Sequence, residues 1–218
     1  MEPPRRVRPG ASGTATYPAG VRRVSGGPDP FAVAVGAIRT LAPRAEFHLE
    51  EAPAPQRLAP DALALTADLV NADDEELASG RFVLLHDPDG AQEWEGTFRV
   101  VVFARAPLES DLASDPMLAD VGWSWLVDAL VGSDATATQL GGTITRTAGT
   151  SFGTMSDRPA EASIEIRASW TPLPLDEAPA QMHRHAAAWL ALLELAAGMV
   201  PIPHEVTRVH AGRRRSRG

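Results

Sequence analysis

The sequence predicts an α+β fold: a single domain with a mainly antiparallel sheet of five to six strands and three helices packed largely on one face. Residues 160–171 alternate between apolar and polar side chains, which is typical of an antiparallel strand with one solvated face. The expected elements run helix, four strands, helix, two strands, helix. This order lacks the regular strand and helix alternation that builds a parallel sheet.

The first helix and the first strands are predicted near the start of the domain. Asp29-Pro30 supplies an N-cap and a first-turn proline, and apolar residues recur at helical spacing from Phe31 until Pro43. Residues 47–49 and 63–69 alternate with period two on either side of a proline-rich bend, and they are predicted strands.

A hairpin is predicted after the acidic run 73–76, which is interpreted as a solvated loop because consecutive carboxylates cannot converge on one cation. Residues 81–87 and 94–104 are its arms. The sequence Asp87-Pro88-Asp89-Gly90 is its expected turn.

The second helix is predicted from Asp115-Pro116 to Gly132. Its buried face is expected to hold Leu118, Val121, Trp125 and Ala129. Residues 140–147 then form a strand with one threonine-covered face, and 149–159 form a loop.

The final helix is predicted over residues 179–199, after the strand at 160–171. Its apolar stripe holds Met182, Ala186, Trp189 and Leu193. Gly198 is expected to close it.

The 218 residues contain no lysine and no cysteine, which excludes several chemistries. Schiff bases, a Walker-type lysine, thiolate catalysis, disulfides and cysteine-bound zinc all require one or the other. We expect no cofactor and no metal ion. Since no signal peptide or apolar span stands out, we expect a cytoplasmic protein without membrane contact.

The formal charge of -8 is unevenly distributed. Residues 1–29 and 204–218 carry charges of +3 and +4, and we expect both to be disordered, arginine-rich arms. Residues 30–203 form the expected single domain and hold ten arginines against 25 acidic residues. Such a body repels nucleic acid, although its arms remain able to touch phosphates.

Candidate catalytic groups do not converge in the sequence. The segment from Leu140 to Gly153 offers glycines, hydroxyls and Arg146 for an anion, but glycines in a strand more often mark a bulge. Ser151 and Ser169 are conceivable nucleophiles, with His183 or His185 as base and Asp128 or Asp157 as orienter. The alternative for every one of these residues is a structural or solvated role.

Histidines and paired carboxylates are read in the same way. His183 and His185 are two residues apart on a helix, so their rings diverge, and Glu194 needs a partner from another element. Structural or solvent-facing roles are also expected for His48 and His86. The pairs Glu93 with Glu95 and Glu161 with Glu165 are expected to project into solvent.

Two tryptophans stand close together on the second helix. Trp123 and Trp125 point in different directions, so both cannot belong to one apolar stripe. Trp125 is assigned to the stripe. Trp123 is expected to pack on the core or to cover a sheet edge or surface groove, where it would anchor an interface.

Several separated blocks resemble an actinobacterial family catalogued as a domain of unknown function, number three thousand in its series. The resemblance covers residues 31–201 and is carried by Gly122 to Leu126, Leu140 to Arg146, Ser151 to Gly153 and Arg167 to Pro172. It implies no activity, substrate or cofactor.

Three functions are compatible with these observations. The first is a non-catalytic module that binds another macromolecule, most simply a protein. The second is a metal-independent hydrolase or transferase built around Ser151, Arg146 and Arg167. The third is weak RNA association through the arginine-rich arms. The candidate binding residues are Trp123, Arg146, Ser151, Arg167 and Trp170.

Overall fold

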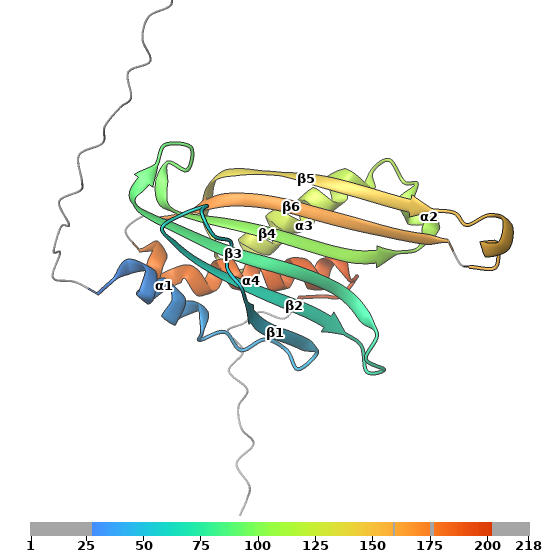
Figure 1. Cartoon of the computed structure of the whole chain (residues 1–218), viewed down its shortest axis with the longest axis horizontal. Helices are drawn as coiled ribbons and strands as arrows, with labels where there is room; N and C mark the ends of the chain where they lie inside the picture. The colour runs from blue at the N-terminus through green and yellow to red at the C-terminus, as the bar shows by residue number, and fades with distance from the viewer. Residues whose placement is uncertain (1–27, 159, 175–176, 202–218) are drawn as a thin grey trace, which may run out of the picture.

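A six-stranded antiparallel sheet in the order β1-β2-β3-β4-β6-β5 forms the frame of the protein (Figure 1). The computed structural model describes residues 28–158, 160–174 and 177–201. The strands are β1 (Phe47–Ala52), β2 (Asp61–Val70), β3 (Glu76–Ala91), β4 (Gly96–Leu108), β5 (Ala137–Gly149) and β6 (Glu161–Pro172). The sheet and its helices confirm the predicted single α+β domain.

Three long helices lie on one side of this sheet (Figure 1). These three are α1 (Pro30–Ile38), α3 (Leu118–Gly132) and α4 (Ala178–Ala196). A four-residue helix, α2 (Ser110–Ala113), and a short 3-10 turn at Gly153–Met155 complete the helical segments of the described residues. α4 contacts the four strands β2, β3, β4 and β6, and α1 and α3 pack against α4. We call this side of the sheet the helix face and the opposite side the outer face.

The expected start and stop signals operate at the helix ends. The Asp29 carboxylate accepts a hydrogen bond from the Phe31 backbone N–H at 3.1 Å. Asp115 accepts one from the Met117 backbone N–H at 2.8 Å, just before α3. After α4, Gly198 adopts a φ of 72°, and the Met199 N–H donates to the Glu194 carbonyl.

α4 is buried on almost all sides because it lies between the sheet, α1 and α3. The Trp189 indole N–H reaches the sheet and donates to the Phe103 carbonyl oxygen at 3.2 Å. A Cβ on Gly80 would lie 2.7 Å from that oxygen and 2.9 Å from Trp189 Nε1. Glycine at position 80 therefore leaves the space that Trp189 occupies.

A second indole is anchored inside the core. Trp170 on β6 donates its Nε1–H to Nδ1 of His185 on α4 at 3.0 Å, and both side chains are buried. Burial, together with the nearby charges of His183 and Arg184, lowers the pKa of His185 to about 4. His185 is therefore neutral at pH 7 and carries its proton on Nε2.

The alternation of β6 is confirmed, with two exceptions on its polar side. Ala162, Ile164, Ile166, Ala168 and Trp170 are all buried. Ser163 and Thr171 were expected to be wet, but they are buried as well. Thr171 donates to the Trp94 carbonyl and accepts from Arg99, so β4 and the turn that precedes it cover this side chain.

One end of the outer face is buried from solvent. Ala64, Val83 and Leu85 form a small buried cluster there. The residues that pack on this cluster are Ala52, Ala54, Ala59, Ala62 and Trp94. The proline-rich bend between β1 and β2 therefore covers part of a face that the period-two pattern alone assigns to solvent.

Two local predictions need correction. The β3–β4 turn is not at Asp87-Pro88-Asp89-Gly90: Ala91 pairs with Gly96, the turn lies at residues 92–95, and the earlier segment is an irregularity within β3. Glu93 and Glu95 consequently lie in the turn and not on a strand face. In α3, Val121 is exposed and Trp125 is half-buried, because the buried residues are Leu118, Gly122, Leu126, Ala129 and Leu130.

The close approach of Trp189 to Gly80 gives a stability prediction. We expect Gly80→Ala to lower the free energy of unfolding by about 1–3 kcal/mol, because a new methyl group must displace an indole in a packed core. Gly36→Ala on α1 is the control, since nothing lies within 4 Å of its added Cβ, and it should keep or raise stability. Urea unfolding measures both; equal effects of the two substitutions would contradict the role given to Gly80.

The buried His185 predicts a pH dependence of stability. Its pKa in the folded state lies below that of an unfolded histidine, so the unfolded chain binds the proton more readily between pH 6.5 and about 4. The stability that neutral His185 contributes is complete above pH 6.5 and is lost as the pH falls toward 4, by about 3 kcal/mol. His185→Gln should have a flatter profile of unfolding free energy against pH. The exposed His48→Gln should keep the wild-type slope, and identical slopes for all three proteins would reject this explanation.

Candidate protein-interaction site

β5 forms a free edge of the sheet (Figure 1). It is 13 residues long, pairs with β6 on one side, and has no partner strand on the other side among the described residues. Most of its residues are exposed, and its only charged side chain is Arg146. Long exposed edges with few charges are prone to pair with another strand, and proteins usually protect them.

The opposite edge, β1, shows such protection. β1 has only six residues, and two of them are the adjacent glutamates Glu50 and Glu51. Short length and charge both discourage edge pairing. The two edges therefore differ in length and in number of charged residues, and β5 is the longer edge with the fewer charges.

A bulge and two glycines shape the beginning of β5. The register with β6 shifts between Thr138 and Gly141, where Gln139 has a φ of 50°. A Cβ on Gly142 would lie 2.3 Å from the Arg167 carbonyl oxygen, so only glycine permits this approach to β6. The predicted bulge is confirmed, and it leaves the rest of β5 as a regular edge.

α3 lies beside this edge and exposes apolar side chains to solvent. Three on the helix are exposed, Val121 by 40%, Val127 by 37% and Val131 by 73%, and so is Met117 just before it, by 58%. α3 contains no lysine or arginine, and its charged residues are Asp120 and Asp128. A surface helix normally carries charged and polar residues on this side.

A groove of about 420 Å³ lies between the end of α3 and the beginning of β5. Its lining consists of Val127, Leu130, Val131, Asp134, Ala135, Thr136, Ala137 and Leu140. The lining is mostly apolar, and Val127 and Val131 belong both to the groove and to the exposed side of α3. We call β5 together with Met117, Val121, Val127 and Val131 the β5–α3 surface.

The predicted anchor Trp123 lies one helical turn before Val127 on α3. Both Trp123 and Trp125 are half-buried and pack against the core. Gly122 lets α3 sit close to the sheet, because a Cβ there would be 2.9 Å from Ile164 Cδ1. Trp123 therefore packs partly against the core and is not among the residues that line the groove.

The two arginines proposed as partners of Ser151 lie on opposite faces of the sheet. Arg146 pairs with the core residue Ile164, so it lies on the helix face, where it donates to the Asp115 carbonyl. Arg167 lies on the outer face, 5.0 Å above the Phe103 ring, and bonds Glu165 at 2.9 Å. The structure does not bring these guanidinium groups together.

Ser151 and Trp170 lie at opposite ends of β6. Ser151 follows the end of β5, where Gly149 pairs with Glu161. Trp170 is nine residues farther along β6, which corresponds to about 30 Å of strand. Trp170 is also fully buried, so it offers no surface to a ligand.

The nucleophile triplets are separated as well. Ser169 accepts a hydrogen bond from Arg99 at 2.6 Å on the outer face, whereas His185 lies on the helix face. Asp128 and Asp157 are exposed. Within the described ranges, no three His, Asp or Glu side chains are arranged to hold a metal ion.

The histidine His86 has a structural environment that the sequence indicated only in general terms. Its ring is stacked between Phe98, at a centroid distance of 4.4 Å, and Phe31, at 5.9 Å. Its Nδ1 lies 2.9 Å from an Asp61 carboxylate oxygen. His86 thus connects β3 to α1 and β2.

Comparison with known protein families identifies one match. Residues 27–207 match the model of the family described as "Protein of unknown function (DUF3000)". The chain belongs to this family. No curated protein and no solved structure matches this DUF3000 chain. In the part of the chain that the structure describes, every helix is too short or too polar to cross a bilayer.

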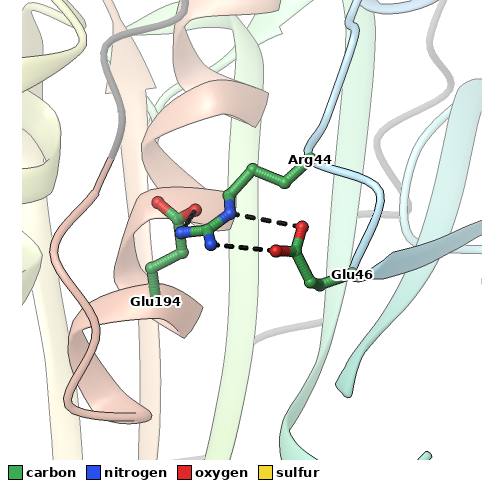
Figure 2. Close-up of polar contacts among 3 residues, drawn as sticks. All are labelled: Arg44, Glu46 and Glu194. Atoms are coloured by element: carbon green, nitrogen blue, oxygen red, sulfur yellow. Dashed lines mark hydrogen bonds and ion pairs between the residues drawn. The ribbon is translucent and has the colours of Figure 1, made fainter. Parts of the chain in front are cut away.

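The DUF3000 chain also contains a partly buried ion pair between a loop and the central helix. Arg44, in the loop before β1, lies between Glu46 and Glu194 (Figure 2). Its guanidinium is 3.1 Å from Glu46 and 3.4 Å from Glu194, whose side chain is only 3% exposed. The hydrogen bond to Glu46 is the largest of the contributions that raise the pKa of Arg44. The sequence showed that Glu194 needed a partner, but it did not show which one.

The ion pair of Arg44 predicts an asymmetric pair of variants. Arg44→Met removes the cation beside a buried carboxylate and should cost about 3 kcal/mol of unfolding free energy. Arg39→Met is the control, because Arg39 and its partner Glu51 are 66% and 56% exposed, and it should cost less than about 1 kcal/mol. Urea denaturation compares the two; similar small losses would show that the Arg44 contact is dispensable.

Proposed function

We propose that this protein is a non-catalytic binding module that takes up a protein partner through the β5–α3 surface. The observation that carries the proposal is the position of a strand edge with a single charged residue, unpaired among the described residues, directly beside an apolar groove. An extended segment of a partner adds to such an edge through backbone hydrogen bonds. Its alternate side chains then enter the neighbouring groove.

The apolar side chains of α3 supply a favourable contribution to such binding. Covering a half-exposed valine or methionine contributes roughly 1 kcal/mol at 25 cal/mol per Å². The most exposed of these residues, Val131, lines the groove. These terms add to the backbone hydrogen bonds of the edge, and together they offset the entropy lost on association.

The charge of the domain favours protein over nucleic acid at this surface. The exposed charges of α3 are Asp120 and Asp128, and the domain body is acidic. Carboxylates repel phosphates, so nucleic acid is disfavoured here. The RNA hypothesis concerns the arginine-rich arms, which lie outside the described residues. The cysteine-free composition supports a cytoplasmic setting for this activity.

Affinity capture with surface variants tests the proposal. The full wild-type chain should capture a protein partner saturably, and Val131→Lys combined with Val127→Lys should reduce that capture at least tenfold, because two charges enter the apolar groove. Val101→Lys is the matched control, since Val101 on the outer face is as exposed as Val127, and it should bind normally.

Two results would count against this function. The first is that the wild-type chain captures no partner saturably. The second is that a captured partner binds the groove variant and the wild type with the same affinity, measured with purified components.

A further inference from the structure

We infer that the β5–α3 surface binds a second copy of this chain, so that two sheets join edge to edge through their β5 strands. This inference rests on the proposed function and names the partner. The resulting assembly would be a dimer with a two-fold axis near Thr143, the middle residue of β5. In such a dimer the same surface is used by both copies.

The geometry of an antiparallel strand suits this symmetry. β5 already runs antiparallel to β6, and its free side can pair antiparallel with an identical strand about a two-fold axis. α3 contacts β5 on the helix face, so the two-fold axis brings the α3 helices of both copies to the same side of the joined sheet. Both elements of the β5–α3 surface are then covered at once.

The side chains of β5 are compatible with their own copies. Thr143, Thr145 and Thr147 share the outer face with Arg167 and Glu165. With the axis at Thr143, this residue would face Thr143 of the second copy, and Thr145 and Thr147 would face the uncharged Gly141 and Gln139 of that copy. Threonine pairs are favourable between neighbouring antiparallel strands. Arg146 points to the helix face and is held by the Asp115 carbonyl, so it places no like charge at the junction.

β1 lacks this compatibility. Pairing two copies through β1 would bring Glu50 and Glu51 toward the same glutamates of the other copy. Like charges on neighbouring strands are destabilising. A dimer through β5 is therefore favoured over one through β1.

The size of the surface predicts a reversible dimer. β5 is about 43 Å long at 3.3 Å per residue, and a strand with its helix layer is roughly 15 Å high. Each copy would thus contribute about 600 Å², or about 1,200 Å² in total, which is the lower limit for a stable interface. Asp120 and Asp128 of both copies add repulsion, so the dimer should become tighter as salt screens these charges.

Analytical ultracentrifugation of the full chain tests the inference. The wild type should change from the 23.1 kDa monomer to twice that mass as its concentration rises through the micromolar range, and added salt should lower the dissociation constant. Val131→Lys combined with Thr145→Lys should weaken dimerisation at least tenfold, while Val101→Lys should not. Circular dichroism confirms that each variant is folded.

The outcomes separate the dimer from the proposed function. A wild type that stays monomeric at every concentration overturns the dimer, and the proposed function still holds if a different captured protein is lost in the Val127 and Val131 variant. A dimer that persists in the Val131→Lys and Thr145→Lys variant but is lost in Glu50→Arg would place the interface at β1 and overturn the β5 dimer. If a second copy binds the Val131→Lys and Thr145→Lys variant normally, and every captured protein binds the Val127→Lys and Val131→Lys variant normally, both proposals fail.

Discussion

The structure depends on the burial of α4 between the helix face of the sheet and the two helices beside it. Trp189 reaches the backbone of β4 because Gly80 has no side chain, and Trp170 gives its indole hydrogen to the neutral His185. Both indoles therefore bury a large apolar area while their polar atoms remain hydrogen-bonded. Near the C-terminal end of α4, Arg44 likewise forms an ion pair with the buried carboxylate of Glu194. A helix buried on this scale fixes the positions of all the layers around it.

This packing also determines which surface is left uncovered. α1 and α3 both pack against α4, and among the described strands β1 and β5 are the two without a second neighbour. The two edges differ in length and in charge, and α3 places the exposed Val127 and Val131 beside the less charged edge. An open edge and an apolar helix side are separately unremarkable, since each occurs in many folded proteins. The proposed binding role of the β5–α3 surface depends on the two features lying side by side.

Much of the fold could be predicted from local signals, because caps and period-two alternation act within a few residues. Asp29, Asp115 and the strand at 160–171 behave as their patterns indicated. The β3–β4 turn was misplaced because β3 absorbs a turn-like sequence as an irregularity. The candidate site was harder to predict. Which strand lies at an edge depends on long-range pairing, and whether Arg146 and Arg167 share a face depends on register, so chemistry-bearing residue types alone could not identify the site.

Hydrogen exchange of the backbone amides is the most direct measurement of whether the β5 edge is a binding surface. Half of the edge amides of a free strand have no partner, and they gain protection only when another strand pairs with them. We expect residues 137–149 to exchange more slowly as the concentration of the full chain rises, or when a captured partner is added, while residues 47–52 exchange at an unchanged rate. Equal exchange of residues 137–149 under all these conditions would contradict the assignment of function to this edge.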